Sequence, residues 1–170
     1  MANEKVSASV VIAVPAAGLF AVLADPRSHA AIDGSGRSAS GGIGGIQEPV
    51  DTAPLAELGQ VFRMHMYHPR HPDGDYRTAN KIIAFDPPYA IGWLTGTEND
   101  DGELEFGGWF WRYDLAPLGP AATQVTLTYD WSAVPDRIRA YLSFPPFAPE
   151  HLINSLHRLQ DLATGPATHR

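Results

Sequence analysis

The feature that most constrains this chain is a series of strand-like runs, each bounded by turn-forming residues. The runs cover residues 58–68, 76–85, 89–96, 106–115 and 123–131. The segments between them are rich in Pro, Gly and Asp, as in His71-Pro72-Asp73-Gly74 and Asp86-Pro87-Pro88. Short strands joined by such turns pair with their neighbours in the sequence. The series therefore predicts an antiparallel meander.

The N-terminal part of the chain predicts one strand followed by two short helices. Residues 6–14 alternate between apolar side chains and small or polar ones, which is typical of a strand, and a proline then opens a helix over residues 15–24. Asp25-Pro26 is typical of an N-cap with proline at the first helical position, and it predicts a second short helix that ends near Asp33. Residues 34–45 are rich in glycine and indicate a loop or a weak edge strand.

The C-terminal part predicts one long helix. Residues 132–149 carry four prolines, which leave room for one or two helical turns around residues 137–142. A helix over residues 150–163 follows, because its apolar side chains recur on one helical face and Gly165 suits its end. Those side chains are Leu152, Ile153, Leu156, Leu159, Leu162 and Ala163. We expect an α+β domain with about six to seven strands.

Aromatic side chains gather on one face of the predicted sheet, because successive residues of a strand point to opposite faces. The apolar sets are Trp109, Trp111, Tyr113 and Leu115; Val125, Leu127, Tyr129 and Trp131; Phe62, Met64 and Met66; and Ile91 and Trp93. Tyr76, Thr78, Asn80 and Ile82 form the less charged face of their run and are also expected to point inward. Two interpretations remain open: a solid core beneath the C-terminal helix, or the wall of a cavity.

The order of elements resembles the START-like (SRPBCC) superfamily, which includes polyketide cyclases, plant pathogenesis-related allergens and lipid-transfer domains. The segment VPAAGLFAVLADP at residues 14–26 is similar to the opening helices of this group, and FDPPYAIGW at residues 85–93 looks like its usual hairpin. The resemblance covers nearly the whole chain. It implies a helix-grip fold over residues 1–170, a single START-like ligand-binding domain in which a curved antiparallel sheet wraps around the long C-terminal helix.

In such proteins the space between the sheet and the C-terminal helix is commonly a ligand cavity, so the resemblance implies a carrier of a small hydrophobic molecule such as a lipid, a polyketide or an aromatic metabolite. The residues expected to contact the ligand are Phe62, Met64, Met66, Trp93, Trp109, Trp111, Tyr113, Tyr129, Leu152 and Leu156. The family often carries an aromatic residue just after the second short helix, where this chain has Ile32 and Asp33.

Two other functions remain open. The same cavity would serve an enzyme of the cyclase or dehydratase type, for which Asn80, Tyr113 and His68 are weak catalytic candidates that form no recognisable dyad. His151 precedes the apolar face of the last helix, and we expect it to cap or flank that helix in solvent. Alternatively, the sheet or the proline-rich segment is the working surface of a protein-interaction module.

Metal and cofactor sites are not predicted. His65 and His68 would point to opposite faces of an extended segment, so together with His71 they do not converge on one ion. No serine nucleophile elbow, paired-carboxylate motif or dinucleotide fingerprint is present, so no cofactor is expected.

The composition of the chain restricts the kinds of molecule that it is expected to bind. The net charge of −7, without a cluster of basic residues, argues against binding to nucleic acid. No apolar run is long enough for stable membrane insertion, and residues 10–24 are better explained by folded structure than by a secretory signal. The chain lacks cysteine, and we expect a cytoplasmic protein. A homodimer is left open.

Overall fold

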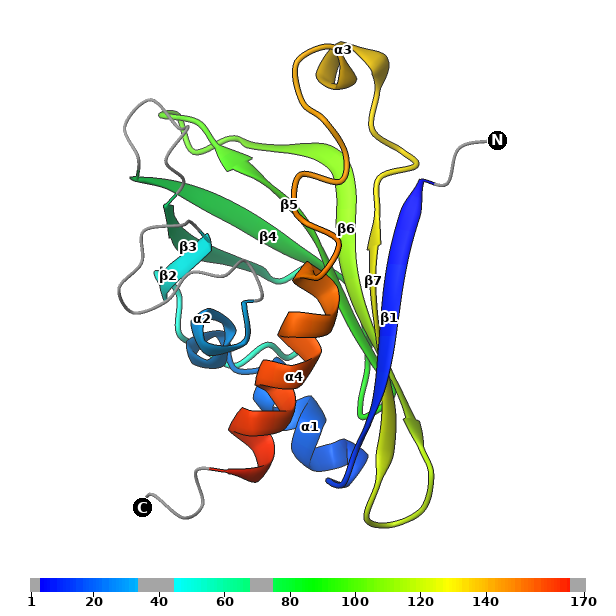
Figure 1. The fold of residues 1–170 in the computed structure, drawn as a ribbon. Coiled ribbons are helices and arrows are strands. Elements are labelled where there is room, and N and C mark those ends of the chain that lie inside the picture. Colours follow the sequence, from blue (N-terminus) through cyan, green and yellow to red (C-terminus); the bar gives the residue numbers. More distant parts are fainter. Residues whose placement is uncertain (1–3, 34–44, 68–74, 166–170) are drawn as a thin grey trace.

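The computed structural model describes residues 4–33, 45–67 and 75–165, and its strands form one antiparallel sheet (Figure 1). The seven strands are β1 (Lys5–Ile12), β2 (Gly45–Pro49), β3 (Val61–Tyr67), β4 (Asp75–Asp86), β5 (Ala90–Glu98), β6 (Leu104–Pro117) and β7 (Thr123–Asp130). Their order in the sheet is β1-β7-β6-β5-β4-β3-β2. The predicted meander is therefore confirmed, and β1 joins it by pairing with β7.

Strand β2 begins at the last residue of the glycine-rich segment, for which a loop or a weak edge strand was predicted. Residues 34–44 lie outside the described part of the chain. From Gly45 onward the backbone pairs with β3, so that Ile46 lies opposite Met66 and Pro49 opposite Met64. The segment thus ends in an edge strand, where a proline is tolerated because one side of the strand needs no sheet partner.

The helices agree with the predicted order, although the early ones are shorter than expected. They are α1 (Ala16–Leu23), the 3-10 helix η1 (Pro26–Ser28), α2 (His29–Ile32), α3 (Asp136–Arg139) and α4 (His151–Thr164). The Asp25 carboxylate accepts a hydrogen bond from the backbone N–H of Arg27 at 3.0 Å. This confirms the predicted N-cap, but the helix that it opens divides into η1 and α2.

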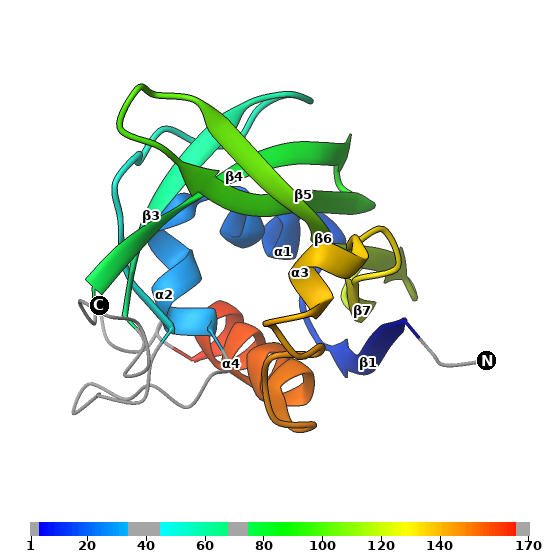
Figure 2. The same cartoon turned by 90° about the horizontal axis from the view of Figure 1, so that it is seen from above.

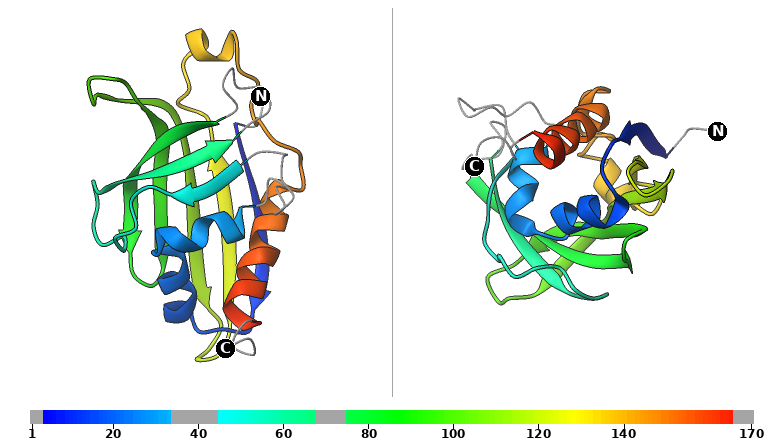
Figure 3. Two further views of the ribbon diagram at one scale, coloured as in Figure 1. Left: turned by 90° about the vertical axis from the view of Figure 1, so that its left-hand side faces the viewer. Right: turned by 90° about the horizontal axis from the view of Figure 1, so that it is seen from below.

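The sheet curls, and α1, α2 and α4 lie on its concave side (Figures 2 and 3). Helix α4 packs beside β1 and contacts α1 and α2. Helix α3 lies apart from them, beyond the C-terminal end of β7 (Figure 1). This arrangement confirms the predicted fold class, an α+β helix-grip with a curved antiparallel sheet around a C-terminal helix.

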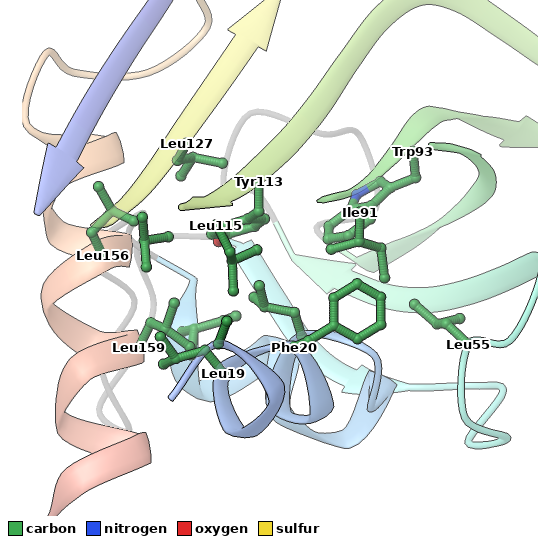
Figure 4. Packing of buried hydrophobic residues seen from close by; sticks show 14 of the residues in the cluster. Leu19, Phe20, Leu55, Ile91, Trp93, Tyr113, Leu115, Leu127, Leu156 and Leu159 are labelled. Atoms are coloured by element: carbon green, nitrogen blue, oxygen red, sulfur yellow. The ribbon is translucent and has the colours of Figure 1, made fainter. Parts of the chain in front are cut away.

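Side chains that alternate inward along the strands form the core between the sheet and the helices. In β7, Val125, Leu127 and Tyr129 are buried, in agreement with the predicted face. Figure 4 shows Tyr113 and Leu115 of the sheet between Leu19 of α1 and the leucines of α4, with Trp93 above Phe20. Burial of one large apolar side chain contributes about 1.5–3 kcal/mol, so this face holds α4 against the sheet.

Candidate functional site

An aromatic wall forms where the start of α4 meets β6 and β7. The Trp111 ring lies 4.6 Å from the Tyr129 ring and 5.5 Å from the Phe147 ring, measured between centroids. Phe147 in turn stacks on His151 at 4.6 Å with an interplanar angle of 24°. Four rings from two strands, one loop and one helix thus form a continuous aromatic cluster, in which Trp111, Phe147 and His151 stack and Tyr129 meets Phe147 edge-on at 75°.

A second group of rings lies under α2. His29 stacks on Trp93 at 5.0 Å and meets Phe62 edge-on at 5.5 Å. Its Nε2 lies 2.8 Å from the Leu23 backbone oxygen, which can only accept, so Nε2 donates this hydrogen bond. Burial lowers the pKa of His29, and the ring is therefore neutral near pH 7.

Asp33 links three elements at the end of α2. Its carboxylate accepts a hydrogen bond from the Ile46 backbone N–H of β2 at 2.6 Å, and its backbone oxygen accepts one from Arg158 of α4 at 2.6 Å. Oδ1 lies 3.9 Å from Nε2 of His151. The Asp33 side chain is only 8% exposed, so the chain buries a carboxylate among rings where an apolar residue would be usual.

His151 is buried, and this corrects the expectation that it caps or flanks α4 in solvent. The residue is 9% exposed because the proline-rich segment before α4 folds back and stacks Phe147 on its ring. Burial lowers the pKa of His151; the Asp33 carboxylate acts against this change, and the Arg158 cation acts with it. The ring is therefore neutral, and its contact with Asp33 is not an ion pair.

Two of the three catalytic candidates lie in the interior. The Asn80 amide nitrogen donates to the Phe62 backbone oxygen at 3.2 Å, and its amide oxygen accepts from the Thr95 hydroxyl at 2.9 Å. Asn80 thus already has partners at both ends of its amide. Burial, together with the charge of Asp33, raises the pKa of Tyr113 well above its ordinary value, so its hydroxyl stays protonated. His68 lies outside the described residues.

The predicted ligand contacts divide between two clusters. The main apolar cluster contains Phe62, Met64, Trp93, Tyr113, Leu152 and Leu156, with Met66 and Trp111 packed against it. Tyr129 belongs to a second cluster, against which Trp109 and again Trp111 pack. The Trp109 ring packs against the Phe144 ring, with 5.7 Å between their centroids, and not against the main cluster. Among the predicted contacts Trp111 packs against both clusters, and Val6 and Phe147 do the same.

Four residues of this region have no strong signal in the sequence, namely His29, Asp33, Phe147 and Arg158. One hint in the sequence pointed to this site. The family resemblance implies an aromatic residue where this chain has Asp33, and the structure has a buried carboxylate there. His29 and Phe147 lie in short or irregular segments, where periodicity does not distinguish an inward side chain from an outward one.

Other parts of the molecule are less suited to a small hydrophobic ligand. A hollow of about 350 Å³ lies at the tip of the β5–β6 hairpin, but Asn99, Glu103 and Glu105 make its lining mostly polar. Within residues 4–33, 45–67 and 75–165, no three His, Asp or Glu side chains are grouped so that they could hold a metal ion. None of the helices in these same ranges has the length and apolar character needed to cross a membrane.

Comparison with curated proteins finds two related sequences, both from Mycobacterium tuberculosis. The uncharacterized protein Rv0088 is 33% identical over 129 residues, which are 76% of this chain and 48% of that protein. The chain thus spans about half the length of the curated relatives it matches. No family model matches the chain.

Solved structures share the fold at low sequence identity. Protein Ms6760 from Mycobacterium smegmatis has a TM-score of 0.62 and 17% identity, covering 96% of this chain and 92% of that one. An AHSA1-like protein from Aeromonas hydrophila has a TM-score of 0.54 and 15% identity, covering 98% and 95%. Together with the curled sheet and the C-terminal helix, these similarities show that the chain has a helix-grip-like fold.

Proposed function

We propose that this protein binds and carries a small hydrophobic molecule in the region between the concave face of the sheet and α4. The observation that carries the proposal is a set of buried polar side chains contributed by the sheet and by the helices α2 and α4. His29, Thr78, Asn80, His151 and Ser155 are each at most 9% exposed. A solid core of this size is normally apolar, whereas binding sites combine an apolar lining with a few oriented polar groups.

The kinds of residue on this face support a ring-containing ligand. Trp93, Trp111 and Tyr113 present flat surfaces that pack against other rings in stacked or edge-on geometry. Met64 and Met66 add flexible apolar side chains that adapt to different shapes. The similarity to helix-grip structures supports the location, since ligands of such folds commonly lie between sheet and helix.

The proposal is tested by native mass spectrometry of the protein purified from a bacterial host, followed by organic extraction. We expect a co-purifying small molecule, or a response of tryptophan fluorescence to compounds from a lipid and polyketide panel. Empty protein with no fluorescence response to any compound would overturn the proposal.

A pair of variants tests where the ligand binds. Met64→Trp adds bulk to a side chain that is 1% exposed on the concave face, and we expect it to abolish binding. Leu118→Trp adds similar bulk to a side chain that is 56% exposed in the β6–β7 turn, and it should bind as the unchanged protein does. Equal binding by the two variants would exclude the region beneath α4.

An enzyme of the cyclase or dehydratase type is the second candidate, and the burial of His151 beside Asp33 favours it. Asp33 Oδ1 lies 3.9 Å from Nε2, beyond hydrogen-bond distance, so it acts on the imidazole through its charge; a histidine beside a carboxylate is a common general base. This candidate predicts turnover of a polyketide-like substrate, which Tyr113→Phe or Asn80→Ala abolishes while ligand binding survives. Ligand binding without turnover would support the carrier function and exclude the enzyme.

A further inference from the structure

The Nδ1 atom of His151 is enclosed by the protein and has no hydrogen-bond partner in the part of the chain that the structure describes. Nearly all buried polar atoms in folded proteins are paired, because an unpaired one costs about 1–3 kcal/mol. An unpaired buried polar atom in a native structure therefore calls for an explanation, and a role in binding or catalysis is one. The position of this atom at the aromatic wall makes it a candidate for a contact with the ligand.

The chemistry of the ring makes Nδ1 an acceptor. The other nitrogen, Nε2, faces the Asp33 carboxylate at 3.9 Å, and a negative oxygen favours the tautomer that carries its proton on Nε2. Burial lowers the pKa of His151, so the ring binds no second proton near pH 7. Nδ1 then carries a lone pair that requires a donor.

The surroundings of the ring restrict what the donor belongs to. Phe147 and Trp111 lie against His151 at 4.6 and 5.5 Å between ring centroids, so a group that reaches Nδ1 would pack against apolar rings. The buried carboxylate of Asp33 repels an anion. Arg158, which donates its Nη1 to the Asp33 backbone oxygen, offsets part of this charge, but a carboxylate anion also has no proton to donate and would meet the lone pair of Nδ1. A neutral hydroxyl on a ring satisfies all three conditions.

We propose that His151 Nδ1 is the polar subsite of the binding region and accepts a hydrogen bond from the hydroxyl group of a neutral, ring-shaped ligand such as a phenol or a polycyclic alcohol. This inference rests on the proposed function, since it names the class of hydrophobic molecule that the region holds. It favours such alcohols over aromatic carboxylates and over compounds of the same shape that lack a donor.

Equilibrium dialysis of the full chain at pH 7 with three matched probes tests the inference. The probes are 2-naphthol, which donates a hydrogen bond, 2-methoxynaphthalene, which does not, and 2-naphthoate, which is an anion. We expect 2-naphthol to bind about tenfold more tightly than 2-methoxynaphthalene, the factor that corresponds to one hydrogen bond. The anion should bind most weakly.

Two variants of α4 assign the preference to one side chain. His151→Phe keeps a flat ring in the wall but removes the acceptor, and it should bind 2-naphthol and 2-methoxynaphthalene equally. His157→Phe makes the same change at an exposed position of the same helix and should keep the tenfold preference. Thermal unfolding of each variant shows whether it is folded.

The outcomes separate the two proposals. Binding of both naphthalenes without preference, a preference that survives in His151→Phe, or tightest binding of 2-naphthoate overturns the inference and leaves the carrier function standing. Failure of the unchanged protein to bind any probe, together with empty organic extracts, overturns both.

If His151→Phe does not fold, NMR of the unchanged protein decides. The ¹⁵N signal of His151 Nδ1 should shift on addition of 2-naphthol and not on addition of 2-methoxynaphthalene. A signal that both probes leave in place, or move equally, counts against the subsite.

Discussion

Phe147 and His151 stack with their ring centroids 4.6 Å apart, and this contact joins the proline-rich segment to the first turn of α4. The N-cap residue of α4, Glu150, forms no side-chain capping hydrogen bond. Tertiary packing therefore has a larger part in fixing the start of this helix than local capping. The same stack helps to bury the His151 ring, and this burial lowers the pKa of His151.

Replacement of Phe147 by alanine should therefore destabilise the protein. Loss of a large ring that is only half-buried costs less than a full core truncation, and we expect about 1–3 kcal/mol in the free energy of unfolding, measured with urea. Tyr141→Ala removes a ring that is 72% exposed in the same segment and should cost less than about 0.5 kcal/mol. Equal effects would mean that Phe147 does not anchor α4.

The two buried histidines predict a loss of stability in mild acid. Burial lowers the folded-state pKa of His29 and His151 below the ordinary value of 6.5, so the unfolded chain binds protons more readily. Their contribution is present above about pH 6.5 and is lost as the pH falls toward the lowered pKa values. Urea unfolding between pH 8 and pH 5 should show this decline.

The double variant His29→Leu/His151→Phe should show a smaller decline in the free energy of unfolding over the same pH interval. His157→Gln changes an exposed histidine and should leave the pH dependence as it was. A double variant that declines as steeply as the unchanged protein would place the responsible groups elsewhere.

Asp33→Asn should lower the pKa of His151 further. The carboxylate opposes the effect of burial by favouring the charged imidazole, and the amide removes that charge while its oxygen can still accept from Ile46. An NMR titration of the histidine ring signals measures the change. Asp161→Asn, on the exposed side of α4, should leave the value unchanged, and a raised pKa in Asp33→Asn would contradict the electrostatic account.

The agreement between sequence and structure is best where a pattern has a physical period. The alternation in β7 and the leucines of α4 predicted which side chains are buried, since every second residue of a strand and every third or fourth of a helix shares an environment. Asp25-Pro26 predicted a helix start because the N-cap bond is local. These elements were enough to define the fold.

The site was less predictable because its contacts are neither local nor periodic. The Asp33 carboxylate is held by a backbone N–H on β2, and no side-chain pattern reveals a backbone partner. His151 owes its burial to Phe147, which lies in a segment without regular structure. Strand β2 itself has only five residues and ends in a proline, which weakens its signal.

Gly108 lets β6 pass close to the turn after β7. Its φ is 103°, and a Cβ atom there would lie 2.6 Å from the Ala133 backbone oxygen. Gly108→Ala therefore combines an unfavourable backbone conformation with a clash against main chain, and we expect a cost of about 2–4 kcal/mol in urea unfolding.

Gly119→Ala separates these two effects. Gly119 also has a positive φ, 134°, but a Cβ atom there would meet nothing within 4 Å. The control should therefore cost only the backbone part, about 1–2 kcal/mol. The extra loss in Gly108→Ala should be accompanied by a change in the fluorescence of Trp131, because that residue lies just before the displaced turn and packs in the second apolar cluster. Equal losses for the two variants would show that the turn moves away from β6 at little cost.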